Sequence, residues 1–209
     1  MAAATDTSAK RAPVAGLLLA AGGGQRLGGR PKALLECGDG RLLVERAMRE
    51  MREGGCATVH VVLGAGAAEV RERLGRLPPG VALVDNPRWA EGMGSSLRAG
   101  LASLTSVTDA TAALVMLVDQ PRIGARAVAR LLAARREGAQ LVAAAYGGER
   151  GHPVLFGREH WEGVARAADG DQGARAYLRQ RADAVVLVEC ADIAAPDDID
   201  TPEDLALLE

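Results

Sequence analysis

The chain reads Val14-Ala-Gly-Leu-Leu-Leu-Ala-Ala-Gly-Gly-Gly-Gln-Arg-Leu-Gly-Gly-Arg-Pro-Lys32 near its N-terminus. The residues up to Ala21 form an apolar run of the kind that makes a buried strand. The residues after Ala21 include five glycines. A glycine-rich loop that leaves a strand lets the backbone approach a ligand and direct its N–H groups at phosphate oxygens. The stretch therefore predicts a strand followed by a phosphate-binding loop.

Lys32 is unusual in this chain, because almost every other basic residue is an arginine. There are 23 arginines, and the second lysine is Lys10. We interpret position 32 as one that requires a compact ammonium group rather than a planar guanidinium group. Arg26 adds positive charge to the same loop. The alternative is a mobile surface loop with incidental charge.

Two familiar glycine motifs do not fit this loop. The dinucleotide fingerprint requires a glycine three residues after Gly24, where the chain has Leu27. A Walker loop that ends at Gly29 would continue with lysine and serine or threonine, but Arg30 and Pro31 follow. The loop is thus directed at phosphate without belonging to either common type.

Composition and length narrow the classes of protein. The 209 residues, 48% hydrophobic and 25% charged, suit one α/β domain, which we expect over residues 13–209 after a disordered tail at 1–12. A net charge of −2 and five aromatic residues argue against a nucleic-acid partner. No stretch approaches the roughly 20 apolar residues that span a bilayer. Three widely spaced cysteines are compatible with a cytoplasmic protein.

Strand-like apolar runs alternate with helical patterns, which predicts crossover units and a mostly parallel central sheet. The expected strands are Val14–Leu19, Thr58–Leu63, Val81–Val84, Ala113–Val118, Leu141–Ala145 and Val185–Glu189. The expected helices are Leu42–Arg52, Ala67–Leu74, Gly94–Leu104, Ala125–Arg136 and Ala174–Arg181. In such sheets ligands bind beyond the carboxyl ends of the strands, so the segments just after strands should carry the chemistry.

Two acidic segments could hold a metal ion. Asp119 directly follows the apolar run Leu114–Val118, and its carboxylate suits Mg²⁺, although an aspartate there could equally cap a turn or helix. Near the C-terminus, Thr201-Pro-Glu-Asp204 has the features of a helix start, which leaves the acids of Asp197–Asp200 unexplained. These carboxylates repel one another unless they are solvated or bind a cation.

Two further segments could bind substrates. Ser95 and Ser96 open a predicted helix, where free N–H groups and hydroxyls suit an anion or nucleotide, although Ser95 could simply cap that helix. His152, in Arg150-Gly-His-Pro-Val-Leu-Phe156, could contact an acceptor substrate or could be an edge-strand residue. His60 and His160 are interpreted as structural or exposed.

The opening stretch resembles the nucleotidyltransferase signature Leu-Ala-(Ala/Gly)-Gly-x-x-x-Arg-x-Gly-x-x-x-Lys. It is similar, more narrowly, to the MobA/MocA-like enzymes of molybdenum cofactor maturation. The residues on the pattern are Leu19, Ala20, Ala21, Gly22, Arg26, Gly28 and Lys32. Over residues 14–208 the resemblance implies a three-layer Rossmann-like nucleotidyltransferase fold. The run Glu91-Gly-Met-Gly-Ser-Ser-Leu97 resembles the cytidylyl branch of the family rather than the guanylyl branch.

The resemblance also implies residue roles. It favours Asp119 as a metal ligand and gives Asp200, just before Thr201-Pro202, as the second, with Asp198 a weaker candidate. Arg26 and Lys32 would contact the triphosphate. The nucleotide would lie against Leu19, Ala20, Ala21, Gly22, Gly24, Gly28, Ser95 and Ser96. The acceptor side would include Arg150, His152, Asp171 and Arg175.

The expected reaction is Mg²⁺-dependent transfer of CMP from CTP to the phosphate of molybdopterin, with release of pyrophosphate. A phosphate monoester is already largely dianionic near pH 7, with a second pKa of about 6, so no nucleophilic side chain is needed. A molybdoenzyme or its maturation chaperone would be the protein partner. The alternatives are a guanylyl- or cytidylyltransferase for another phosphorylated acceptor, such as a sugar phosphate, and a non-catalytic chaperone that delivers the cofactor.

Overall fold

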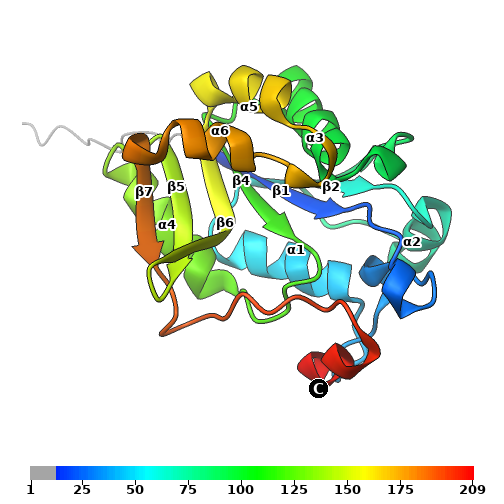
Figure 1. Ribbon diagram of the computed structural model, residues 1–209. Helices are drawn as coiled ribbons and strands as arrows, with labels where there is room; N and C mark the ends of the chain where they lie inside the picture. The colour runs from blue at the N-terminus through cyan, green and yellow to red at the C-terminus, as the bar shows by residue number, and fades with distance from the viewer. Residues whose placement is uncertain (1–12) are drawn as a thin grey trace, which may run out of the picture.

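The computed structural model describes residues 13–209, and the tail expected over residues 1–12 lies outside that range. One sheet of seven strands runs through these residues in the order β3-β2-β1-β4-β6-β5-β7 (Figure 1). The strands are β1 Val14–Ala20, β2 Thr58–Leu63, β3 Val81–Asp85, β4 Ala112–Leu117, β5 Leu141–Tyr146, β6 Glu149–Gly157 and β7 Val185–Glu189.

β1 lies in the middle of the parallel part of the sheet. It pairs in parallel with β2 and with β4, so that Leu19 is in register with Val62 on one side and Leu117 on the other. All seven residues of β1 are buried, since helices cover both faces of the sheet. The apolar run before the glycine loop is therefore a central strand, as its pattern predicts.

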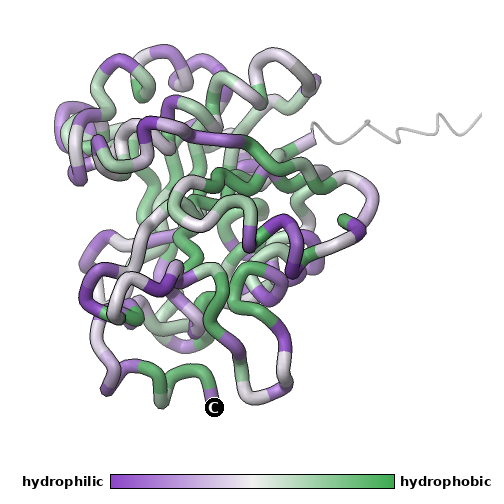
Figure 2. The backbone as a smooth tube through the Cα atoms, turned by 90° about the vertical axis from the view of Figure 1, so that its right-hand side faces the viewer, coloured by the Kyte–Doolittle hydropathy of each residue, from purple (hydrophilic) through white to green (hydrophobic). Residues whose placement is uncertain are grey.

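The helices form two layers, one on each face of the sheet. α1 Leu43–Glu53, α2 Ala67–Leu74 and α4 Ala125–Arg136 pack on one side, and α3 Met93–Val107, α5 Trp161–Ala167 and α6 Arg175–Gln180 on the other. Alternate residues of each strand supply the two cores: Leu18 faces the α1 side, whereas Leu17 faces α3. The expected three-layer α/β fold is confirmed. Figure 2 shows apolar segments through the interior and hydrophilic segments mostly around them.

One strand and one α-helix of the described residues were absent from the sequence prediction. The first is β6, the only antiparallel strand of the described sheet, which lies between β4 and β5. His152 therefore lies on an internal strand, and the edge-strand interpretation is wrong. Pro153 hides this strand in the sequence, because proline is rare inside sheets; here it coincides with an irregular register between Ala143 and Ala145. The second is the short helix α5.

The hairpin between β5 and β6 matters for the position of the site. Gly147 and Gly148 both have positive φ, 62° and 85°, as a tight two-residue turn requires. The reversal brings the start of β6, with Arg150, to the edge of the sheet where the parallel strands end. At this edge, the start of β6 therefore lies beside the ends of the parallel strands.

The segment after β7 returns along the same edge (Figure 1). Ile199 is fully buried there, and its backbone N–H donates to the carbonyl of Asp119 at 2.9 Å. The chain then enters a 3₁₀ helix, Pro202–Leu208, whose start is capped by Asp204. Within residues 13–209, no helix has the length and apolar character needed to cross a membrane.

Candidate active site

The glycine loop between β1 and Lys32 is folded back on itself. The carbonyl of Gly24 accepts hydrogen bonds from Leu27 N at 2.8 Å and Gly29 N at 3.0 Å. Gly24 has φ of 59°, and a Cβ atom there would collide with the carbonyl of Arg30. Only glycine satisfies both requirements. The compact turn returns the chain to the sheet edge and places Lys32 beside the end of β4.

Lys32 joins the two carboxylates that the sequence proposes as metal ligands. Its Nζ donates to Asp119 Oδ2 at 2.7 Å and to Asp200 Oδ1 at 2.6 Å. The other oxygen of Asp200 accepts from Arg26 at 3.1 Å. Four residues separated by up to 174 positions therefore form one charged cluster at the carboxyl ends of β1 and β4.

The electrostatics of this cluster follow from its geometry. Partial burial by itself lowers the pKa of Lys32, but the charges and hydrogen bonds of Asp119 and Asp200 outweigh it, so the net shift is upward. The hydrogen bond from Lys32 is the main reason that the pKa of Asp200 is lowered. Near pH 7 Lys32 is therefore fully charged, and so is Asp200.

The two carboxylates fit a divalent metal ion. One ammonium group contacts both, so Asp119 and Asp200 are close enough to share a single cation, and carboxylate oxygens are the ligands that Mg²⁺ prefers. Residues 13–209 contain no cluster of three or more histidine, cysteine, aspartate or glutamate side chains arranged to hold a metal. Water or phosphate oxygens would have to supply the remaining positions.

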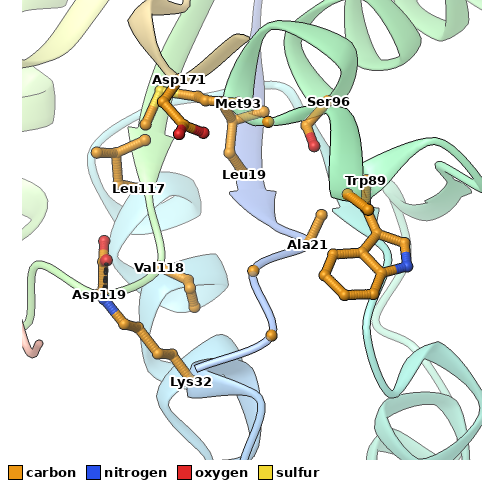
Figure 3. A pocket seen from close by; sticks show the side chains of 14 residues that line it. Leu19, Ala21, Lys32, Trp89, Met93, Ser96, Leu117, Val118, Asp119 and Asp171 are labelled. Atoms are coloured by element: carbon orange, nitrogen blue, oxygen red, sulfur yellow. Dashed lines mark hydrogen bonds and ion pairs between the residues drawn. The ribbon is translucent and has the colours of Figure 1, made fainter. Parts of the chain in front are cut away.

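A cavity of about 330 Å³ opens beside this cluster (Figure 3). Its walls come from the ends of β1 and β4, the glycine loop and the loop between β3 and α3. Predicted site residues on its walls are Leu19, Ala21, Gly22, Lys32, Ser96, Asp119 and Asp171. The nucleotide and metal candidates are thus largely brought together, and Asp171, expected on the acceptor side, joins them.

Several predicted nucleotide contacts lie elsewhere. Ala20 points to the opposite face of the sheet, because strand residues alternate, and packs in the core beneath α1. Gly24 and Gly28 shape the loop but do not line the cavity. Ser95 is buried, and its hydroxyl donates toward the carbonyls of Arg88 and Gly92. The capping interpretation is wrong, because Gly92 is the N-cap of α3 and no side chain caps the helix there.

Several residues on the cavity wall were not predicted as site residues, among them Gly23, Trp89 and Met93. Trp89 starts the 3₁₀ helix Trp89–Glu91, immediately before the run that resembles the cytidylyl branch. A lone tryptophan beside a glycine-rich, ligand-binding segment was an available signal. This signal was overlooked because the small number of aromatic residues in the chain was taken as an argument against base stacking.

A second cavity of about 190 Å³ adjoins the first. The two share Leu19, Met93 and Leu117 as a common wall. Three of the four predicted acceptor residues line the second cavity: Arg150, His152 and Arg175. Gln120 and Asp198 line it as well, and Gln120 Nε2 donates to Asp198 Oδ1 at 2.8 Å.

Two arginines and one aspartate line the second cavity. Burial, aided by the charges of Arg175 and Arg150, lowers the pKa of His152 to about 4, so its imidazole is neutral near pH 7. Burial also raises the pKa of Asp198, as do the nearby Asp119 and Asp200. The other two histidines are structural, as expected: His60 hydrogen-bonds Ser103 at 2.9 Å and His160 hydrogen-bonds Tyr177 at 2.8 Å.

Comparison with known proteins agrees with this geometry. Nicotine blue oxidoreductase of Paenarthrobacter nicotinovorans is 42% identical, over 92% of this chain and 94% of its own length. The crystal structure of an Rv0371c homologue from Mycobacterium sp. strain JC1 is 34% identical, with a TM-score of 0.77 over 95% of this chain and 98% of that one. A manganese complex of Rv0371c from Mycobacterium tuberculosis H37Rv is 27% identical, with a TM-score of 0.72 over 94% and 97%.

The family match covers most of the described fold. Residues 16–185 match the MobA-like NTP transferase domain, from within β1 to the first residue of β7. The match therefore includes Lys32 and Asp119, while Asp200 lies beyond it. On the combined evidence of signature, fold and relatives, the chain belongs to the MobA-like NTP transferase family and is a nucleotidyltransferase.

Proposed function

We propose that this nucleotidyltransferase moves CMP from CTP to the phosphate group of molybdopterin, with Mg²⁺ as the metal ion. The observation that carries the proposal is the pair of adjoining cavities. One is lined by Lys32 and Asp119, which Lys32 joins to Asp200; the other is lined by arginines suited to an anionic acceptor. Their shared wall would bring an acceptor phosphate next to the triphosphate.

In the proposed reaction, an oxygen of the acceptor phosphate attacks the α-phosphorus of the triphosphate. A new bond forms between them, the bond from the α-phosphorus to the bridging oxygen breaks, and pyrophosphate leaves. No proton has to be removed from the nucleophile, since the acceptor phosphate is already ionised near pH 7. Catalysis would then rest on positioning and on neutralisation of charge.

The chain's own residues have distinct parts in this reaction. Asp119 and Asp200 would hold the metal ion, which when bound would neutralise charge on the phosphate oxygens. Lys32 and Arg26, released from the carboxylates that they now contact, would bind the triphosphate. The free backbone N–H groups of Gly22 and its neighbours would face the same phosphates.

The acceptor side is supported by charge. Within residues 13–209, neither Arg150 nor Arg175 forms an ion pair, yet both line the second cavity beside a neutral His152. Unpaired guanidinium groups are suited to phosphate, which they can bind through two parallel hydrogen bonds. Apolar residues of the same cavity, among them Val154 and Phe156, would pack against the organic part of the acceptor.

The test is release of pyrophosphate, measured with each of the four nucleoside triphosphates, Mg²⁺ and candidate acceptors. CTP with molybdopterin should give the highest rate. A higher rate with a sugar phosphate would transfer the proposal to that acceptor. Absence of pyrophosphate release with every acceptor, together with tight cofactor binding, would instead identify a delivery chaperone. The three cysteines are free thiols, and we propose that the reaction takes place in the cytoplasm.

A second candidate comes from the relative named nicotine blue oxidoreductase. In that case a reduced nicotinamide nucleotide would occupy the first cavity and an aromatic electron acceptor the second. The cluster of Lys32, Asp119 and Asp200 favours nucleotidyl transfer, because hydride transfer does not need a pair of metal-binding carboxylates. Oxidation of NADH or NADPH by the protein, with no release of pyrophosphate from any triphosphate, would favour the second candidate.

A further inference from the structure

Trp89 is held in place by a network of buried hydrogen bonds. Asn86, 3% exposed, donates through its side-chain amide to Ser95 Oγ at 2.8 Å and to Ser96 Oγ at 3.0 Å. Its side-chain oxygen accepts from Arg88 N at 3.0 Å, and its carbonyl accepts from Trp89 N. The loop that carries Trp89 is therefore fixed to the start of α3, and the indole has a defined position.

Two glycines lie against Trp89 and leave room for its side chain, because they carry no Cβ atom. A Cβ atom on Gly23 would lie 3.2 Å from Trp89 Cζ3 and 3.3 Å from Cη2, tighter than most real contacts. A Cβ atom on Gly64 would collide with Trp89 Cβ and lie 2.8 Å from the carbonyl of Ala21. The segments that follow β1 and β2 thus pack directly against the tryptophan: a side chain at Gly64 would collide with it, and one at Gly23 would require it to shift.

The indole and the charged cluster lie at opposite sides of the same cavity. In Figure 3 Trp89 lies on one side, beside Ala21 and Ser96, and Lys32 and Asp119 lie on the other. A triphosphate that reaches Lys32 leaves its nucleoside part toward the side where Trp89 lies. Trp161, the other tryptophan, is 4% exposed and donates to the carbonyl of Phe156 in the core of the α3 layer.

We propose that the indole of Trp89 is the platform on which the nucleobase stacks, which makes it a positioning residue for the nucleotide. The inference rests on the nucleotide site of the proposed function. An aromatic face in a fixed position accepts any base, and one-ring pyrimidines leave more of the 330 Å³ cavity free than purines do. Trp89 would therefore supply binding, and the residues around Ala21 would supply discrimination.

Fluorescence provides the first test, because the chain contains two tryptophans and one of them lines the cavity. CTP with Mg²⁺ and without acceptor should quench the wild-type emission. The Trp89→Phe variant should lose the quenching, whereas Trp161→Phe should retain it. Quenching of equal size in Trp89→Phe would overturn the proposal, and it would do so even if Trp161→Phe failed to fold.

Kinetics provide the second test. Base stacking is worth about 1–3 kcal/mol per base, so Trp89→Leu should raise the KM for CTP by about 5- to 150-fold and change kcat by less than about threefold. Trp89→Phe, which keeps an aromatic face, should restore most of the binding. An unchanged KM in Trp89→Leu would overturn the stacking role.

The two proposals can fail separately. If CTP quenches Trp89 but no acceptor yields pyrophosphate, the reaction is wrong and the platform stands. If turnover is normal and Trp89→Leu binds CTP like the wild type, the platform is wrong and the reaction stands. A fall in kcat with unchanged KM would likewise overturn the platform, since uniform loss of binding raises KM alone.

Discussion

The two cavities at the carboxyl edge of the sheet are built in different ways. The first is formed largely by short segments that follow β1, β3 and β4, and two of its charged residues, Lys32 and Asp119, already contact each other. The second is formed by β6 and α6 together with the side of α3, and its arginines make no ion pair within the described residues. One wall of Leu19, Met93 and Leu117 separates them.

The difference shows where each kind of specificity resides. Beside the first cavity, Lys32 forms ion pairs with two carboxylates, Asp119 and Asp200. A metal ion and a phosphate group would replace these ion pairs, the metal ion on the carboxylates and the phosphate on Lys32. In the second cavity, Arg150 and Arg175 form no ion pair in the described part of the chain and lie beside a neutral His152, so an anionic ligand would balance their charge. The first cavity is therefore suited to a metal–phosphate complex, whereas the second is suited to an anion without a metal.

The largest expected effect is on the metal side of the first cavity. Asp119→Asn or Asp200→Asn should reduce Mg²⁺-dependent turnover by about 1,000-fold or more, because a bound metal contributes several kcal/mol of charge stabilisation. Binding of Mn²⁺ in the presence of CTP should weaken in parallel, and thermal unfolding should show that the fold is kept.

Asp197→Asn is the matched control for this pair. Asp197 is exposed and contacts Arg122 at 3.2 Å, and it lies three residues before Asp200 on the same segment. Its loss should leave turnover near the wild-type rate. An Asp200→Asn variant as active as Asp197→Asn would remove Asp200 from the metal site and reopen the case for Asp198.

The next largest effect should come from Lys32. Its ammonium donates to two carboxylate oxygens at 2.7 and 2.6 Å, a geometry that suits a compact point charge better than a longer side chain with a planar guanidinium group. We expect Lys32→Ala to lose about 2–4 kcal/mol of transition-state stabilisation and Lys32→Arg to lose part of it, despite its equal charge. Steady-state kinetics check this, with Arg30→Lys as an exposed control; wild-type kinetics in Lys32→Arg would contradict it.

A smaller effect should sharpen the contrast between the cavities. Arg175→Ala should raise the KM for the acceptor by about 10- to 100-fold, since a hydrogen bond to a charged group contributes about 1.5–3 kcal/mol. The KM for CTP should stay unchanged. Arg179→Ala, on the same helix but outside the cavity, should alter neither. A rise in the KM for CTP instead would mean that the two cavities bind a single ligand.

Many residues of the first cavity could be predicted from the sequence because they lie directly after strands. β2, α2, α4 and β7 have the predicted bounds, and the glycine loop, Lys32 and Asp119 all follow central strands. The contact between Lys32 and Asp200 spans 168 residues and was not predicted; the family resemblance proposed only that Asp200 is a metal ligand. Physical patterns alone place residues on elements and do not pair elements distant in sequence.

The second cavity could be predicted only in part, because one of the strands that form it was missed. β6 was missed because Pro153 and two neighbouring glycines, Gly148 and Gly151, obscure its alternation, so the reversal that brings His152 inward could not be anticipated. Hydroxyl direction was equally hidden: Ser95 and Ser96 are adjacent, yet only Ser96 lines the first cavity. Such distinctions depend on the residue at which the helix begins, because a shift of one position changes the direction in which each side chain points.

The smallest expected effect concerns the choice of base. Ala21 is 6% exposed, lines the first cavity and directly follows β1, and under the proposal its methyl group would narrow the nucleoside side. We expect the wild type to prefer CTP to GTP, because the methyl group crowds a purine more than a pyrimidine. Ala21→Gly should relax the preference only in part, since one methyl group typically discriminates by about 1–3 kcal/mol. Ala20→Gly is the matched control: it removes the same group from the opposite face of the strand, so it can affect stability without affecting the base. The ratio of kcat/KM for the two triphosphates decides the matter. A wild-type preference for GTP would overturn the cytidylyl assignment, and equal shifts in both variants would show that backbone freedom, not the methyl group in the cavity, sets the preference.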